Sequence, residues 1–424
     1  MISSFSLKYE KFTSFFQIIL FLSILLFCFF VSFNPSIGKE LLNNMFYIWL
    51  LSLNFKKLYF NFKNNKIFFL IILFFIWIIF SILMTPTTNY YNFDNFIKYF
   101  LLPILIISTS IKVEHIKYLL SSFLLGMFIN ELISYGIYFE FIKDKFLGFD
   151  IVGHKSNPVP FLTSHIEYTL FLSLSILMSL FGIFKVNNKI LKVILLVFSI
   201  TMITNLFLTI GRTGQFTLFI TSLFLVGIYF RRNWKYIVFS LITLGCIFIL
   251  AFNFSSNVNT RLTQGYSDIK KVIKEKDYNT SWGIRLSSYI IIPDIIKNEE
   301  FNVFFGMGYC EVDKIIQKIH IDKFGKDSSF SGTFGHLHNT YITIFAGLGF
   351  VGLFIFLMLW YYLFTIKIDD YYLNYIRYSF LFVVTFGGLS SNLFWQREVM
   401  LLSAIFISII ICLTTKNDKE EINA

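Results

Sequence analysis

Cysteine is scarce in this sequence, and the positions of the few cysteines exclude two kinds of framework. The four cysteines among 424 residues are Cys28, Cys246, Cys310 and Cys412, and no two of them have the spacing of a metal site. Three of them lie inside apolar runs, which is not the pattern of a disulfide scaffold. We therefore expect neither a disulfide framework nor a cysteine-based metal centre.

Nucleotide-binding motifs are absent as well. The chain contains no phosphate-binding P-loop and no glycine-rich dinucleotide turn. The acid-x-acid triplet Glu311-Val312-Asp313 occurs in a polar stretch, but it stands without a positioned partner. We interpret the triplet as solvated surface rather than as a metal site.

Apolar residues, in contrast, are abundant. The chain is 56% hydrophobic with a mean hydropathy of +0.69, which is too apolar for a soluble multidomain protein and predicts a polytopic membrane protein. A spanning helix needs about 20 apolar residues, and by that measure the chain contains about twelve spans. The first run, 13–33, lacks a small-residue cleavage pattern, so we expect it to remain as the first span.

The formal net charge of +11 is distributed in a way that fits a membrane protein rather than a nucleic-acid partner. Basic residues form short clusters between apolar segments, at 56–66, 185–192 and 231–235. Clusters of this kind mark cytoplasmic loops. The resulting topology places both termini in the cytoplasm and gives no reason to expect nucleic-acid binding.

The predicted fold is an all-α integral membrane protein with about 12 transmembrane helices and one large, partly helical outer loop. The first nine spans occupy residues 1–252, the loop 253–337, the last three spans 338–415, and a cytoplasmic tail 416–424, all within one integrated membrane domain. Within the loop, 283–297 has helical spacing, and Pro293 should bend or end that helix. Pro103 should kink the fourth span.

The stretch from 335 to 352 is the first candidate for chemistry. His336 and His338, with Asn339, stand where an apolar span meets water, and intramembrane or interfacial ionisable groups mark functional sites. Histidine changes charge near neutral pH, so proton transfer by His338 is the first hypothesis. The alternative is an interfacial histidine bonded to a backbone carbonyl. The glycines at 347, 349 and 352 should let a neighbouring helix or a lipid chain approach closely.

Two arginines and a further histidine are the other candidates. Arg212 lies in a glycine-flanked turn at the end of a span, and its planar guanidinium suits phosphate oxygens. A snorkelling side chain at a helix end is the alternative. Arg285, in the predicted loop helix, is a second phosphate ligand or a solvated residue. His165, near Glu167, is a weaker candidate at the mouth of the site. The same predicted face also carries His154, Lys155 and Arg397.

The spacing around His338 resembles a known signature. His338-Asn339, nine residues, Gly349, two residues and Gly352 are similar to the motif of the O-antigen ligase and polymerase superfamily of bacterial membrane glycosyltransferases. The segment from Trp282 to 308 resembles the outer loop that precedes that motif, and the 211–212 turn resembles the superfamily's outer arginine site. Together with the predicted spans, the resemblance covers most of the chain.

The resemblance implies a reaction and roles for the candidate residues. Glycan would pass from undecaprenyl pyrophosphate to an acceptor hydroxyl at the periplasmic face of the bacterial inner membrane. Arg212 and Arg285 would hold the pyrophosphate, and His338 would activate the hydroxyl for inverting attack at the anomeric carbon. His336, Asn339 and His165 would support these groups. No cofactor and no metal is implied, because the leaving group is already good.

Members of this superfamily differ in their acceptor. Ligases transfer to a lipid A-core sugar, polymerases to another carrier-linked repeat, and some relatives to a protein hydroxyl. We favour a ligase, with lipid A-core as acceptor, because the single long outer loop directly precedes the histidine motif. The mid-length loop 140–165 keeps a polymerase open. A transporter or lipid-linked glycan flippase would instead carry ionisable residues near the bilayer midplane and paired repeats, neither of which the sequence shows.

Overall fold

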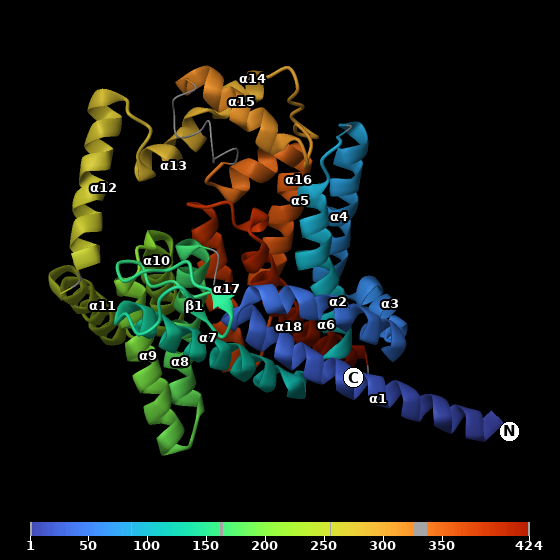
Figure 1. Ribbon diagram of the computed structural model, residues 1–424. Helices are drawn as coiled ribbons and strands as arrows, with labels where there is room; N and C mark the ends of the chain where they lie inside the picture. The colour runs from blue at the N-terminus through green and yellow to red at the C-terminus, as the bar shows by residue number, and fades with distance from the viewer. Residues whose placement is uncertain (1, 86, 162–163, 255, 326–336, 423–424) are drawn as a thin grey trace.

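The computed structural model describes residues 2–85, 87–161, 164–254, 256–325 and 337–422, and these fold almost entirely into helices (Figure 1). In chain order the elements are α1 (Ile2–Phe33), α2 (Pro35–Ser52), α3 (Phe55–Asn64), α4 (Lys66–Met84), α5 (Tyr91–Phe96), the π-helix η1 (Ile97–Leu101), α6 (Leu102–Ser110), the 3-10 helix η2 (Val113–His115), α7 (Ile116–Tyr138), β1 (Lys145–Phe146), β2 (Phe149–Asp150), α8 (His165–Lys185), α9 (Lys189–Leu208), α10 (Arg212–Phe230), α11 (Trp234–Phe254), α12 (Ser256–Glu275), α13 (Ser281–Ile290), α14 (Ile292–Lys297), α15 (Val312–Phe324), α16 (Thr340–Thr365), α17 (Tyr371–Gly388), the 3-10 helix η3 (Leu393–Trp395) and α18 (Arg397–Ile422). The two short strands pair antiparallel in the loop after α7.

Among the described residues, nine helical segments are long and apolar enough to cross a membrane. They are Phe12–Phe33, Lys66–Met84, Tyr91–Ser110, Val113–Tyr138, His165–Lys185, Lys189–Leu208, Arg212–Phe230, Thr340–Thr365 and Arg397–Thr415. Three further predicted spans form the helices α2, α11 and α17, which are not among these nine. A helical, multi-pass membrane protein is therefore confirmed, while the count of twelve spans stays a prediction.

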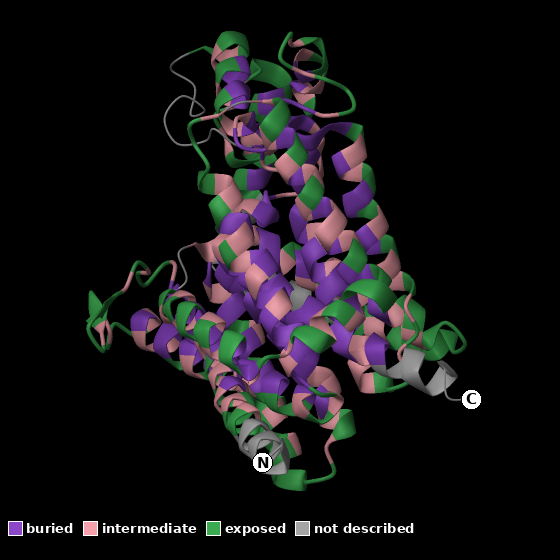
Figure 2. Cartoon of the chain, turned by 90° about the vertical axis from the view of Figure 1, so that its right-hand side faces the viewer, coloured by how far each residue is buried: buried purple, intermediate pink, exposed green. Residues whose placement is uncertain are grey.

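The centre of the molecule is the last helix. Nearly all residues of the apolar stretch within Arg397–Thr415 of α18 are buried, and the helix packs against α6, with α1 and α3 also beside it. Around this centre α16 packs on α4, and α17 packs on α8 and α10. Figure 2 shows buried residues concentrated along these inner helices and exposed residues on the outer surfaces. On a membrane protein those exposed apolar surfaces face lipid.

The two prolines that were expected to disturb helices lie at helix irregularities. Pro103 lies in the first turn of α6, directly after the π-helical η1, so the fourth predicted span is irregular where proline lacks its N–H group. Pro293 lies in the first turn of α14, and the helix predicted over 283–297 is divided at Ile291 into α13 and α14. The helix end expected at Pro293 is confirmed, while the kink at Pro103 stays a prediction.

The interior of α16 contains a break at Gly349, whose φ of +66° is unfavourable for other residues. The backbone of the loop 303–308 fills this break: Met307 N donates to Ala346 O at 2.7 Å, and Phe350 N donates to Val303 O at 2.7 Å. A Cβ atom at Gly349 would lie 2.3 Å from the carbonyl carbon of Phe304. The predicted close approach is therefore confirmed, and its partner is a loop rather than a helix or a lipid.

The outer segment between α11 and α16 has a small apolar core of its own. Buried residues of α15 and of the turns around α14 pack on the outer half of α16, among them Ile291, Met307, Ile316 and Ala346. In Figure 1 helices α12 to α15 lie in the upper part of the view, above the bundle, and we call them the cap. This core fixes the position of α13 relative to the start of α16.

The acidic triplet in this cap is not solvated surface, so that interpretation was wrong for both carboxylates. Thr87 donates a hydrogen bond to Glu311, and Asn92 Nδ2 donates to Asp313 Oδ2 at 3.0 Å. Burial raises the pKa of Asp313 to about 6, although the bond from Asn92 acts in the other direction. The two groups attach the start of α15 to the turn after α4 and to α5, a long-range contact that sequence spacing could not indicate.

Candidate active site

Three helix starts from distant parts of the sequence form the site, and side-chain caps fix two of them. At the start of α16, Asn339 accepts a bond from Ile342 N at 3.0 Å through its side-chain oxygen. At the start of α13, the hydroxyl of Thr280 accepts a bond from Gly283 N at 2.9 Å. At the start of α10, Gly211 precedes Arg212, and a Cβ atom at Gly211 would lie 2.3 Å from the Thr169 side chain.

Arg285 lies on α13 and points toward the end of α17. Its Nε donates to the carbonyl oxygen of Ser390 at 3.2 Å, and its Nη1 donates to the hydroxyl and carbonyl oxygens of Ser281 at 2.9 and 2.6 Å. These neutral acceptors orient the guanidinium without neutralising it. They leave its positive charge available to an anion.

The same face of α13 holds the histidine motif. His338 N donates to the hydroxyl of Ser288 at 3.1 Å, and Asn339 Nδ2 donates to the Tyr289 hydroxyl at 2.8 Å. Positions 285, 288 and 289 are three and four residues apart on α13, so they share one side of the helix. Through this helix the structure places Arg285 and His338 at one site.

Arg212 joins the site from α10. The Ser390 hydroxyl lies 3.4 Å from the Thr213 hydroxyl, and Ser390 is also the residue that accepts the bond from Arg285. Burial lowers the pKa of the Arg285 guanidinium, and the nearby positive charge of Arg212 lowers it further. Arg212 Nη1 lies 3.9 Å from Asp268 Oδ2 of α12. Arg212 therefore faces one carboxylate and is also near enough to Arg285 to affect its charge.

His165 lies beside the Arg212 turn. It is the first residue of α8, and its carbonyl oxygen would be 2.9 Å from a Cβ atom placed at Gly211. Glu167, which suggested a chemical role for this region, is the capping partner of Ser164: its carboxylate accepts from Ser164 N at 2.9 Å. The structure thus places the backbone of His165 beside the Arg212 turn, while Glu167 caps the start of α8.

Other cations of the same predicted face do not join the group. Arg397 donates to the hydroxyl of Tyr91 and stacks over the Tyr91 ring at 5.1 Å. Lys155 pairs with Glu140 at 3.2 Å, and the His154 ring contacts Ser156 at 2.8 Å. His336 belongs to 326–336 and lies outside the described residues.

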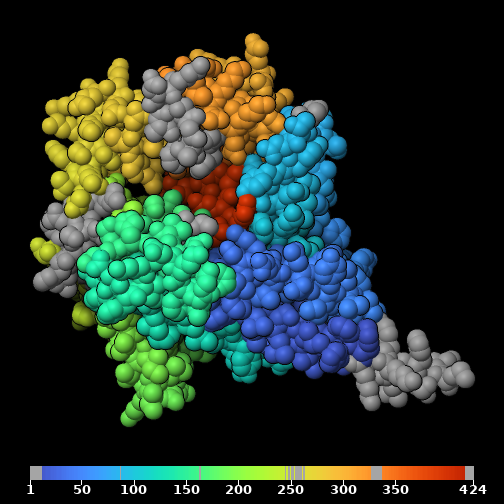
Figure 3. Space-filling model, viewed as in Figure 1, coloured from blue at the N-terminus to red at the C-terminus, as the bar shows by residue number. Residues whose placement is uncertain are grey.

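The space-filling view shows a hollow in one face of the molecule. In Figure 3 the red C-terminal part of the chain is visible at the bottom of a hollow. The yellow and orange cap lies above this hollow, and the teal loop after α7 and the blue N-terminal helices lie below it.

Four contributors to the site were missed in the sequence: Ser288, Tyr289, Ser390 and Asp268. The first two could have been found, because they lie one helical turn after Arg285 on the predicted helix. Ser390 and Asp268 offered no comparable signal, since their relation to the arginines depends on how α12 and α17 pack.

The donor set of this site suits anion binding and proton transfer. Two guanidinium groups can hold phosphate oxygens, and an imidazole at a helix start can accept a proton from a hydroxyl group. Within the described part of the chain, no group of three or more His, Cys, Asp or Glu side chains is placed to hold a metal ion. The side chains gathered here are thus of the types that bind anions and transfer protons.

Comparison with known proteins agrees with this chemistry. Residues 197–357 match the family model described as O-antigen ligase, a stretch that runs from α9 into α16 and contains Arg212, Arg285 and His338. No curated protein matches the chain. The family match confirms the superfamily that the histidine motif indicated.

Proposed function

We propose that this protein transfers glycan from undecaprenyl pyrophosphate to a hydroxyl of a lipid A-core sugar. Residues 197–357 match the O-antigen ligase family, which supports the proposal. The family supports a membrane glycosyltransferase of the O-antigen ligase or polymerase type. The donor, the acceptor, the periplasmic location of the site and its setting in the inner membrane are the finer parts of the proposal. The observation that supports an anionic donor is that Arg212 lies near enough to Arg285 to lower its pKa, while Ser288, on the same side of α13 as Arg285, contacts the backbone of His338.

In the proposed reaction the His338 imidazole takes the proton of the acceptor hydroxyl while its oxygen attacks the anomeric carbon. The bond from that carbon to the pyrophosphate breaks, and the pyrophosphate leaves with the electron pair. Arg212 and Arg285 stabilise its growing negative charge. Attack and departure on opposite sides invert the anomeric configuration.

The first test separates the roles of base and anion ligand. His338→Ala should abolish transfer in purified, folded protein without weakening donor binding. Arg212→Ala and Arg285→Ala should each weaken donor use by about 1.5 to 3 kcal/mol, the range of a charge-assisted hydrogen bond. Arg397→Ala is the matched control, because that arginine contacts Tyr91 instead. Wild-type transfer by the His338 variant would remove His338 from the mechanism.

The second test identifies the acceptor, which is where the alternatives differ. In cells that lack the protein, a ligase predicts long glycan on the carrier together with bare lipid A-core. A polymerase predicts lipid A-core capped with single repeats, and a protein transferase predicts normal lipopolysaccharide with unmodified protein. A flippase predicts donor retained on the cytoplasmic side.

A further inference from the structure

Residues 140–152, which we call the hairpin loop, fold back onto the end of α7. The backbone N–H groups of Phe141 and Ile142 both donate to the carbonyl oxygen of Gly136, at 2.8 and 3.0 Å. The Ile142 side chain packs against an apolar cluster that includes Ile137 of α7. The start of the loop is therefore held against the last turns of that helix.

Aromatic contacts attach the two strands of the loop to α1. The ring centroids of Phe146 in β1 and Phe149 in β2 lie 6.3 and 6.0 Å from that of Phe161, which lies 5.3 Å from that of Phe33. Phe33 is the last residue of α1. Because the candidate membrane spans of α1 and α7 end at Phe33 and Tyr138, the loop lies where both spans leave the bilayer.

Large apolar side chains of this region are exposed although apolar contacts hold the loop in place. Phe141 is 84% exposed, Leu147 74% and Val152 71%, and Phe139, just before the loop, is 58% exposed. Exposed apolar side chains that gather in one region mark a site of protein or membrane contact.

The tip of the loop is an unfavourable place for leucine in water. Leu147 and Gly148 are the two residues between the paired strands, and their φ values are +50° and +83°. A two-residue turn with positive φ at both positions favours Asn or Gly at the first of them. The Cβ atom of leucine is disfavoured in this conformation, and the side chain here is also exposed. An apolar environment at the tip would remove the second of these costs.

The charges of the loop are balanced. Lys145 pairs with Asp150 at 3.4 Å, and Lys155 pairs with Glu140 at 3.2 Å. Residues 140–155 contain three basic and three acidic residues in total. The loop thus offers no net charge to a charged partner, and its apolar side chains decide what it contacts.

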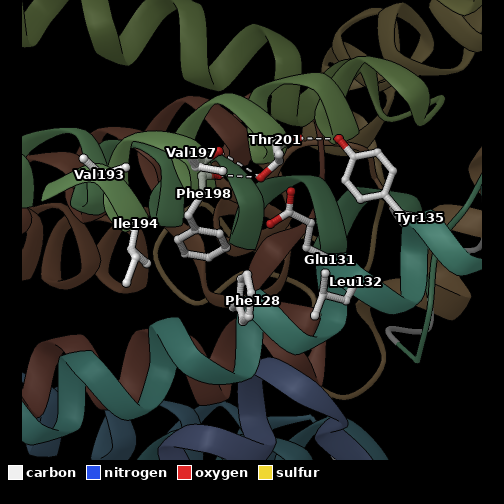
Figure 4. Close-up of a pocket in the computed structure, with 9 residues that line it drawn as sticks. All are labelled: Phe128, Glu131, Leu132, Tyr135, Val193, Ile194, Val197, Phe198 and Thr201. Atoms are coloured by element: carbon white, nitrogen blue, oxygen red, sulfur yellow. Dashed lines mark hydrogen bonds between the residues drawn. The ribbon is translucent and has the colours of Figure 1, made fainter. Parts of the chain in front are cut away.

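The apolar surface of the loop continues onto the membrane face of α7. A cavity of about 380 Å³ between α7 and α9 is lined mainly by apolar side chains, with Glu131 and two other polar residues at one end (Figure 4). Its rim includes Leu132, which is 54% exposed. Tyr135 of the same lining lies 6.4 Å from Phe139 between ring centroids, and Phe139 lies 6.1 Å from Phe141. Aromatic contacts therefore lead from a membrane span to the loop without a break.

We infer that the hairpin loop inserts the side chains of Phe141 and Leu147 into the boundary between headgroups and acyl chains, in the leaflet at the ends of α1 and α7. The partner is the lipid surface itself, bound through apolar burial rather than charge. In Figure 3 this loop lies below the hollow, so its attachment fixes the hollow relative to the lipid surface.

This inference is independent of the glycan transfer proposed above and is tested in lipid nanodiscs. The full-length protein carries Cys246→Ser, which removes the exposed cysteine and leaves three buried ones. Leu147→Cys is labelled with an environment-sensitive fluorophore, which is quenched either by doxyl groups high on the lipid chains or by aqueous iodide. Lys314→Cys in the cap, with an 84% exposed side chain, and Leu132→Cys on α7 are the matched positions.

The label at 147 should be quenched by the doxyl lipid and protected from iodide, as at 132, whereas the label at 314 should show the reverse. Quenching should be the same in phosphatidylcholine and in phosphatidylglycerol nanodiscs, because the loop has no net charge. Iodide quenching at 147 equal to that at 314 overturns the inference. So does protection from both quenchers, which indicates a protein contact, or doxyl quenching that occurs only with phosphatidylglycerol.

A second label, at Val152→Cys, shows whether the two apolar side chains cause the insertion. Phe141→Asp combined with Leu147→Asp should abolish doxyl quenching at 152 and admit iodide. Val303→Asp, a change at a 51% exposed position of the loop 303–308, is the control and should leave quenching at 152 unchanged. Unchanged doxyl quenching at 152 in the double variant contradicts the inference.

Discussion

The hydroxyl group of Tyr289 accepts a hydrogen bond of 2.8 Å from the side-chain nitrogen of Asn339 and donates to the carbonyl oxygen of Leu389 at 3.2 Å. The same Asn339 nitrogen donates to Leu389 O at 3.2 Å. Helices α13, α16 and the end of α17 therefore meet at one polar contact, directly beside His338. The position of the proposed base depends on this contact, although Tyr289 itself need not touch substrate.

Tyr289→Phe should slow catalysis more than it weakens binding. Removing the hydroxyl deletes the contact to Asn339 but leaves the ring in place, at a cost of about 1 kcal/mol in stability. His338 then loses part of its alignment, and we expect kcat to fall about tenfold while KM for the donor stays within about twofold. Steady-state kinetics on purified protein measure both constants.

Tyr361→Phe is the control for that variant, because Tyr361 is exposed near the other end of α16. A fall in kcat with Tyr361→Phe as large as that with Tyr289→Phe would show a general effect of tyrosine loss. A raised donor KM with unchanged kcat would instead place Tyr289 with the anion-binding arginines.

Gly349→Ala should detach the loop 303–308 from α16. The backbone at Gly349 has a positive φ, and a Cβ atom there would lie 2.3 Å from the Phe304 carbonyl carbon, so both strain and overlap oppose any side chain. We expect a loss of several kcal/mol, on the order of 3, or displacement of the loop. Thermal unfolding and hydrogen exchange of residues 303–308 measure the two outcomes.

The matched glycine is Gly227 in α10, where a Cβ atom would meet nothing within 4 Å. Gly227→Ala should leave stability unchanged or raise it by up to about 1 kcal/mol, because alanine is the better helix former. Equal behaviour of the two variants would contradict the tight fit at Gly349.

His320 should make the cap less stable in acid. Burial lowers the pKa of His320 to about 4, from an ordinary value near 6.5, so between these values the unfolded chain binds more protons. Stability is therefore fully present above about pH 6.5 and falls as pH decreases, by about 2 kcal/mol at pH 5. Hydrogen exchange of α15, corrected for intrinsic rates, measures this loss.

His320→Leu should remove that loss, whereas His154→Leu, a change in the exposed loop after α7, should retain it. Wild type and the two variants are compared at the same pH. This is needed because burial raises the pKa of Asp313 to about 6, so Asp313 stabilises the cap as pH falls and partly offsets the effect of His320. Identical pH profiles for wild type and His320→Leu would contradict the assignment to His320.

Much of the architecture followed from the sequence because its signals are local. Long apolar runs predict membrane helices without reference to neighbours, and Pro103 and Pro293 lie at irregularities of the predicted helices. The motif at His338 and Asn339 indicated both a helix start and a superfamily. The hydrogen bond that holds Asp313 could not be predicted, since its partner Asn92 lies more than two hundred residues away in the chain.

The sequence alone thus determined the class of protein, the places where helices begin or break, and the residue types that could bind an anion or move a proton. Tertiary structure alone decided that Arg212 and Arg285 approach each other, that α13 connects them to His338, and that Arg397 contacts aromatic rings instead. It also decided that Glu131 borders a cavity open to the apolar surface. The reason is physical: propensity and hydrophobicity act over a few neighbouring residues, whereas such contacts depend on how complete helices pack.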